Sequence, residues 1–421
     1  MKILLTGHIS FVLMKQYSSL LKTAMPEAQL AFYGLNKPGG ELTAAEKAQF
    51  GEVIEPPSIS SSAVKKTIFS GQWLGLKGQP KPWKSIFKKL LTLRVGSAYY
   101  LLYQWVEEQL KIQARKELFA PFDIVNIHYC APGFLQQLDY VQPSQKIMLS
   151  FWGSDLFQET GIEAYTAQLQ AIEKADAITL HTPEMEQIFL SKFGRAFQAK
   201  IHKTIFGCHQ ERFDMINQLQ QQPTKIRAFK EKYNIPNNKT IVQIGYSGAK
   251  GNQHVAVIQE LTKHAASLKD ELFLLLPTTY NNTDSTYASL LETTLKNSIF
   301  EHAHLTAYLT DEEVLLLPII ADVHINVRDA DALNNAMIEA FYAGCWMILG
   351  AWLPYGILRR MGFKYNEVVD LSEIPKLLSN NQLAPSFEEC TQNAKVAREK
   401  IAMHHCIPKW AAVYQKLYQS L

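Results

Sequence analysis

Residues 240–260 read TIVQIGYSGAKGNQHVAVIQE, and this segment is the most informative about how the 421-residue chain folds. It begins with an apolar run at residues 240–244 and passes through a turn with three glycines. An amphipathic stretch follows, and we expect a helix over residues 253–264. A short buried strand that leads through glycines into a helix is the unit of doubly wound parallel sheets. We therefore predict an α/β fold.

The same alternation of short apolar runs and longer amphipathic stretches occurs along most of the chain. The predicted strands form two series: residues 2–6, 123–127, 146–149 and 177–180, and then residues 240–244, 272–276, 323–327 and 346–349. A single hydrophobic core stops growing near ~250–300 residues, so a chain of this length is expected to form two domains. We predict one doubly wound α/β domain for each series.

A change in composition predicts the boundary between the two domains. Residues 213–238 are polar and rich in glutamine, and they contain no strand signal. We predict an N-terminal domain over residues 1–215, a linker with helical parts over residues 216–238, and a C-terminal domain over residues 239–404. A final helix, expected to begin after Pro408, places apolar side chains on one stripe: Trp410, Val413, Tyr414, Leu417, Tyr418 and Leu421.

Overall composition excludes several classes of protein. The chain has 42 Lys and Arg against 39 Asp and Glu, a surplus too small for a general nucleic-acid binder, so we expect no nucleic-acid partner. Its five cysteines lie far apart without a CxxC pair, which favours a reducing, cytoplasmic setting over a disulfide framework or a zinc site. The uncharged stretch at residues 340–358 contains three glycines and a proline, and it is better explained as a helix end, a strand and a loop than as a membrane span.

One segment has an unusual charge distribution. Residues 56–106 contain no acidic residue and eight basic ones, and Trp and Phe are interleaved with them over residues 64–94. Basic residues that alternate with aromatic rings suit an anionic membrane surface, which we predict as a partner. A site for an anionic lipid-phosphate acceptor would look the same, and so would a solvated basic face over ordinary core residues.

The glycine-containing turn is a candidate phosphate site. Gly245 allows a phosphate to approach the backbone, and the free N–H groups at the start of the following helix favour an anion. Tyr246 and Ser247 lie in the same turn, and Lys250 could neutralise a diphosphate. The turn matches neither a Walker A loop nor GxGxxG, and a tight turn with a solvated lysine explains it equally well.

A second motif, DALNNAMIEAFYAG at residues 331–344, contains two acidic residues. Asp331 is expected in a loop after a strand, and the next helix is expected to start near Asn334 or Asn335, whose N–H groups can receive phosphate oxygens. Glu339 would lie early in this helix, where a carboxylate can accept both hydroxyls of a ribose. A glutamate in an apolar run needs a partner if it is buried, so Glu339 could instead hold an internal group.

These motifs resemble those of GT-B glycosyltransferases, above all family four. The Asp331/Glu339 motif is similar to the family's E-x7-E donor motif, and GYSGAKG is similar to its G-R-x-x-x-x-K-G loop, with Tyr246 where an arginine is common. Residues 204–214, residues 308–323 and the last helix also resemble the family's segments in the same order. The resemblance implies two Rossmann-like domains facing a cleft, with the helix at residues 405–421 returning to the N-terminal domain.

The resemblance also implies roles. The C-terminal domain would bind a nucleotide diphosphate sugar through the turn, Asp331, Asn334, Asn335 and Glu339, with Tyr308 near the base. No metal and no cofactor would be needed, the nucleotide sugar being a substrate. The N-terminal domain would hold the acceptor. Asp155, His128 and His8 follow predicted strands there, so each is a candidate general base, although a helix cap or a structural histidine is the plainer interpretation.

Residues 150–156 (SFWGSDL) resemble a stretch of bacterial dTDP-N-acetylfucosamine:lipid-linked acceptor transferases. This narrower resemblance implies a polyprenyl-diphosphate-linked or other glycan acceptor, and a cytoplasmic protein that is peripheral on the inner face of the membrane. It leaves open whether the anomeric configuration is retained or inverted, and only an inverting enzyme requires a base such as Asp155. A sugar-nucleotide 2-epimerase of the same fold and a non-catalytic subunit remain alternatives.

Overall fold

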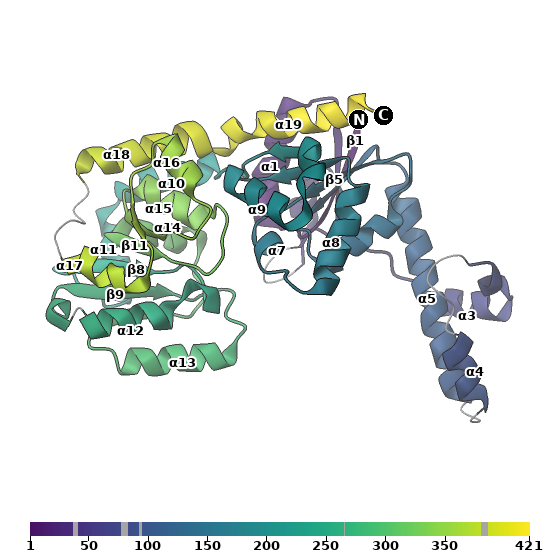
Figure 1. Cartoon of the computed structure of the whole chain (residues 1–421), viewed down its shortest axis with the longest axis horizontal. Helices are drawn as coiled ribbons and strands as arrows, with labels where there is room; N and C mark the ends of the chain where they lie inside the picture. Colours follow the sequence, from purple (N-terminus) through teal and green to yellow (C-terminus); the bar gives the residue numbers. More distant parts are fainter. Residues whose placement is uncertain (37–40, 77–82, 92–94, 265, 380–385) are drawn as a thin grey trace. The chain divides into compact units, whose positions relative to one another are not determined.

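The computed structural model describes residues 1–36, 41–76, 83–91, 95–264, 266–379 and 386–421. Contacts divide these residues into two compact units, which are described separately (Figure 1). The first unit comprises Met1–Phe151, Gly161–Thr179 and Ala411–Leu421, and the second comprises Trp152–Thr160 and Leu180–Trp410. Each of the two parallel sheets described below has helices between its successive strands, which confirms the predicted α/β class.

The first sheet has seven strands in the order β3-β2-β1-β4-β5-β6-β7. Their bounds are β1 Lys2–Gly7, β2 Gln29–Tyr33, β3 Glu52–Ile54, β4 Ile124–His128, β5 Lys146–Ser150, β6 Ala177–Leu180 and β7 Ile201–Lys203. All four predicted strands are confirmed to within one residue at each end. The direction of the strand order reverses between β1 and β4, and such a switch point is where open α/β sheets bind ligands.

The second sheet has six strands in the order β10-β9-β8-β11-β12-β13, and all of them pair in parallel. Their bounds are β8 Thr240–Ile244, β9 Leu272–Pro277, β10 Glu301–Leu305, β11 Val323–Asn326, β12 Trp346–Gly350 and β13 Asn366–Val368. The four predicted strands are again confirmed, and the switch point falls between β8 and β11.

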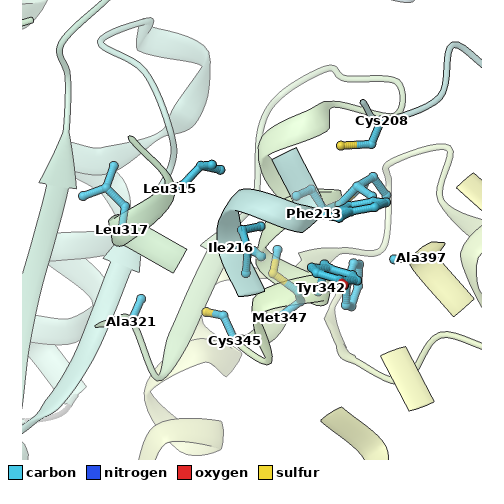
Figure 2. Packing of buried hydrophobic residues seen from close by; sticks show 14 of the residues in the cluster. Cys208, Phe213, Ile216, Leu315, Leu317, Ala321, Tyr342, Cys345, Met347 and Ala397 are labelled. Atoms are coloured by element: carbon cyan, nitrogen blue, oxygen red, sulfur yellow. The ribbon is translucent and has the colours of Figure 1, made fainter. Parts of the chain in front are cut away.

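One large core of the second unit lies where helices cover the sheet. Figure 2 shows Phe213 and Ile216 of α10 (Gln210–Gln220) beside Tyr342 of α15 (Asn335–Ala343) and Met347 of β12. The rings of Phe213 and Tyr342 stack with their centroids 4.2 Å apart. Ile216 and Leu219 of α10 and Phe229 of α11 (Pro223–Lys232) belong to this core, so the segment expected to be a linker contributes buried side chains to the second unit.

The last helix, α19, spans Met403–Gln419, so the prediction that it begins after Pro408 is wrong. Pro408 lies inside the helix, where a missing N–H removes one backbone hydrogen bond without ending it. The Tyr414 hydroxyl accepts a hydrogen bond from Asn126 Nδ2 at 2.6 Å and lies 3.1 Å from the Tyr17 hydroxyl. These bonds fix the end of the chain to the first unit, as the resemblance implied.

The basic segment forms α3 (Ser61–Phe69), η1 (Gln72–Gly75), α4 (Trp83–Leu91) and the first part of α5 (Val95–Phe119). Helices α3 and α4 pack on α5 (Figure 1). Val64 of α3 forms a small buried cluster with Trp105 and Val106 of α5. Three basic residues of the segment lie outside the described residues: Lys77, Lys81 and Arg94.

Residues 340–358 divide among the end of α15, strand β12, a loop and the start of α16 (Gly356–Met361), as predicted. Within the described ranges, none of the helices has the length and hydropathy to cross a membrane.

Candidate functional site

The turn after β8 has the predicted strand–turn–helix form. It runs from Gly245 through η4 (Lys250–Asn252) into α12 (His254–His264). Gly245 has a φ of +63°, and a Cβ atom there would lie 2.8 Å from the side chain of Asn252. Asn252 Nδ2 donates to the Ser247 carbonyl at 3.0 Å and lies 2.9 Å from its hydroxyl oxygen. Packing within the protein therefore explains the glycine and the shape of the turn.

Tyr246 contacts an arginine that the sequence motifs did not include. Arg328 follows β11, and its guanidinium carbon lies 5.2 Å from the centroid of the Tyr246 ring. Its Nη1 donates a hydrogen bond of 2.5 Å to the Tyr246 hydroxyl. Burial raises the pKa of Tyr246 well above its usual value, so the hydroxyl stays protonated. The two residues follow β8 and β11, which flank the switch point of the second sheet.

Asp331 braces the loop between β11 and α15. Its Oδ1 accepts a hydrogen bond from the Ala332 N–H at 2.9 Å, and its Oδ2 accepts from the Tyr355 hydroxyl at 2.8 Å and from Asn334. Partial burial raises the pKa of Asp331, although Arg328 opposes this shift. The carboxylate therefore has neutral donors as its direct partners and a cation nearby.

The start of α15 lies where the sequence predicted it. Asn334 is the N-cap, and its Oδ1 accepts the Met337 N–H at 2.7 Å, while Asn335 is the first residue of the helix. The side chain of Asn334 is thus committed to the helix end, and backbone N–H groups remain the ones that could receive a phosphate.

Glu339 has an internal partner, Arg212 of α10. Arg212 Nη2 donates to Glu339 Oε2 at 3.1 Å, and its Nε donates to Oε1, so the pair is bidentate. The side chain of Glu339 is 5% exposed and that of Arg212 is 21% exposed. Arg212 is not among the site residues predicted from the sequence. A buried carboxylate needs a partner, so the sequence indicated that Glu339 would have one if it were buried. It did not indicate that this partner is Arg212.

Two predicted donor residues lie on the surface. Lys250 is exposed, and within the described ranges its ammonium group has no ion pair. Tyr308 lies in the turn between β10 and α14 (Asp311–Ile320), and it is also exposed. The Gly248 N–H donates to the Tyr280 carbonyl at 2.8 Å, so the segment after β9 also borders the turn. Residues that follow β8, β9 and β11 thus gather at the carboxyl edge of the second sheet.

In the first unit, His8 and His128 flank the switch point between β1 and β4. The His8 N–H donates to the His128 carbonyl at 2.9 Å. The His128 ring is buried, with its Nε2 3.1 Å from Asn126 Nδ2, whereas His8 is exposed and its ring lies beside those of Tyr129 and Phe134. His8 is therefore the more accessible of the two candidate bases.

Asp155 is fully buried in α7 (Ser154–Phe157), within the second unit as contacts define it. Its Oδ1 accepts the N–H groups of Trp152 at 2.9 Å and Gly153 at 2.8 Å. Gly153 has a φ of +123°, a conformation that favours glycine. These bonds favour a structural role for Asp155, and its role as a base stays a prediction.

Among the residues that the structure describes, no three His, Cys, Asp or Glu side chains are arranged to hold a metal ion. The expectation that the protein needs neither a metal nor a cofactor stays a prediction.

No family model matches the sequence, and no curated protein matches it. Solved structures do resemble the whole chain. Sucrose-phosphate synthase from Thermosynechococcus elongatus is 12% identical, with a TM-score of 0.65, over 100% of this chain and 99% of that one. The N-terminal domain of Candida albicans trehalose-6-phosphate phosphatase is 14% identical, with a TM-score of 0.64, over 99% and 96%. Anabaena HepE in complex with UDP-glucose is 11% identical, with a TM-score of 0.63, over 100% of both chains.

At sequence identities of 11–14%, the structural similarity to these proteins defines the fold alone. Together with the two Rossmann-like strand orders, it places the chain in the GT-B class of α/β folds. The narrower resemblance to dTDP-N-acetylfucosamine transferases is not confirmed.

Proposed function

We propose that this protein is a glycosyltransferase that moves a sugar from a nucleotide diphosphate sugar to an acceptor hydroxyl. The observation that carries the proposal is the carboxyl edge of the second sheet, where a glycine-containing turn, an exposed Lys250 and the Arg328 guanidinium flank the switch point of a GT-B fold. The complex of HepE with UDP-glucose, a protein of the same fold, supports a nucleotide sugar as the donor.

In this proposal the donor diphosphate lies at the turn of Gly245, Tyr246, Ser247 and Lys250 and at the N-terminus of α15. Negative charge develops on the departing diphosphate as the bond to the sugar breaks. Lys250 and the free N–H groups at the helix start would stabilise that charge without needing a metal. Glu339 would accept the ribose hydroxyls, with Arg212 holding its carboxylate in place. Tyr308 would border the base.

The proposed acceptor is a lipid-linked or cell-surface glycan precursor on the inner face of the cytoplasmic membrane. Four lysines on α3 and α4 are exposed, and the segment also exposes large apolar side chains, with Phe69 79% exposed. Lysines meet anionic head groups while aromatic and aliphatic side chains enter the interface, so these helices suit a membrane surface. His8, His128 or Asp155 would accept the proton of the acceptor hydroxyl.

Thermal unfolding in the presence of UDP, GDP, dTDP or CMP, each with and without an attached sugar, tests the donor site. We expect one nucleoside diphosphate to raise the unfolding temperature. Selective stabilisation by dTDP would support the narrower resemblance. The absence of any shift at millimolar concentrations would contradict the proposal and favour a non-catalytic subunit.

The second test is turnover. Release of the nucleoside diphosphate from the selected nucleotide sugar should depend on added acceptor, for which a polyprenyl-diphosphate-linked sugar is the first choice. Conversion of the sugar without any acceptor would indicate the 2-epimerase instead.

A further inference from the structure

We propose that Arg328 is a further binding residue for the donor diphosphate and that Tyr246 positions its guanidinium. The inference rests on the proposed function, because it names an additional ligand of the same site. Sequence motifs pointed to the turn after β8 for this role, whereas Arg328 lies on the loop after β11.

The first argument is position. The loops that carry Tyr246 and Arg328 leave the two strands that flank the switch point. The backbone of Arg328 is held there by a hydrogen bond of 2.6 Å from Trp352 Nε1 to its carbonyl oxygen. Its guanidinium is held by the Tyr246 ring and hydroxyl. The cation is therefore fixed beside the glycine-containing turn before any ligand binds, which reduces the entropy that binding costs.

The second argument is that one hydrogen-bond donor of the Arg328 guanidinium has no partner among the described residues. Arg328 Nε is buried and has no hydrogen-bond partner among the described residues. Asp331 is the acidic residue that acts on Arg328 electrostatically, yet its two oxygens accept from Ala332, Asn334 and Tyr355. Buried donors are normally satisfied, so an unpaired guanidinium N–H indicates an acceptor that binds from outside.

The third argument is the chemistry of the acceptor. A guanidinium binds phosphate through two parallel N–H···O bonds, a geometry that a lysine cannot reproduce. The exposed Lys250 belongs to the turn that Tyr246 shares. Two cationic side chains at one strand edge suit a diphosphate better than a group with a single negative charge.

Binding measurements on variants test the inference. The probes are UDP, GDP and dTDP, with uridine, guanosine and thymidine as the forms that lack phosphate, titrated by calorimetry. Arg328→Gln should weaken binding of the preferred diphosphate about tenfold or more and leave binding of the nucleoside unchanged. Arg328→Lys keeps the positive charge but cannot form two parallel N–H···O bonds. Its affinity for the diphosphate should therefore lie between those of Arg328→Gln and the unchanged protein. Tyr246→Phe should weaken binding to a smaller extent.

Arg359→Gln is the matched control. Arg359 also lies over a tyrosine ring, 5.1 Å from the centroid of Tyr365, but it is exposed and paired with Glu367 at 2.8 Å. This variant should bind the diphosphate as the unchanged protein does. Equal diphosphate affinity in Arg328→Gln, Arg328→Lys and the unchanged protein would overturn the inference while leaving the proposed function standing. If the unchanged protein binds no nucleoside diphosphate, both fall.

Discussion

The bidentate pair between Glu339 and Arg212 has two consequences at the scale of single residues. Its carboxylate is almost fully buried, so the pair holds α15 against α10. It also occupies the oxygens that we propose for the ribose. A ribose would therefore have to share the carboxylate with Arg212, using the lone pairs that the guanidinium leaves free.

We predict that Glu339→Ala lowers the free energy of unfolding by about 3–5 kcal/mol, because it leaves the Arg212 guanidinium largely buried without its partner. Glu367→Ala removes the partner of the exposed Arg359, and it should cost at most about 1 kcal/mol. Urea unfolding of both variants measures the difference.

A third variant, Glu339→Gln, tests the ribose assignment. Glu339→Gln keeps the shape of the side chain but weakens its acceptor strength, so it should lower affinity for the preferred nucleoside diphosphate. Affinity equal to that of the unchanged protein would show that Glu339 serves only to pair Arg212.

At the scale of elements, α3 and α4 carry the proposed membrane contact. Replacing Lys65, Lys66, Lys84 and Lys88 by glutamine should abolish sedimentation with vesicles that contain anionic lipid, because each basic residue near such a surface contributes about 1 kcal/mol. The matched control replaces four exposed lysines that lie outside α3 and α4: Lys269, Lys296, Lys395 and Lys409. If both quadruple variants lose binding equally, general charge and not these helices would account for it.

A second prediction at this scale concerns α19. Tyr414→Phe removes the hydroxyl that bonds Asn126 and Tyr17, both of them buried. We expect a loss of about 1–3 kcal/mol in the free energy of unfolding, because a buried amide is left with fewer partners. Tyr418→Phe, on the exposed part of the same helix, should leave thermal unfolding unchanged.

The strands show which elements of the fold can be predicted from the sequence. The central strands are buried on both faces, so each is a short and mostly apolar run, and all eight predicted strands are present. The strands that were missed include β3, β10 and β13, which lie at or near the sheet edges and have partly exposed residues that weaken the apolar pattern. β2 was also missed, although its residues LAFY are buried and apolar.

The site was less predictable for a physical reason. Turns and helix starts depend on neighbouring residues, and those at Gly245 and Asn334 were predicted. Arg212 and Glu339 are 127 positions apart, and Arg328 and Tyr246 are 82 positions apart. The members of such pairs meet only in the folded protein. The spacing of residues along the sequence therefore does not show which side chains will contact each other.

At the scale of the whole molecule, three buried histidines predict acid sensitivity. Burial lowers the pKa of His181, His254 and His324 to about 4. They stay neutral in the folded protein as pH falls below ~6.5, whereas the unfolded chain takes up protons there. Stability should therefore decrease between about pH 6.5 and 4, by up to about 1.4 kcal/mol per pKa unit for each histidine.

Urea midpoints at several pH values measure this dependence. His324→Leu should flatten the profile in that range. A profile unaffected by His324→Leu would contradict the prediction.

The bond between Tyr17 and Tyr414 joins positions that are 397 residues apart. During synthesis on the ribosome, most of the first unit is made early, but it lacks the Tyr414 side chain until α19 has been translated. The second unit receives its last residue, Trp410, just before the chain reaches Tyr414. Maturation of the first unit is therefore delayed until after the second has emerged, the reverse of the order in which most of their residues are made.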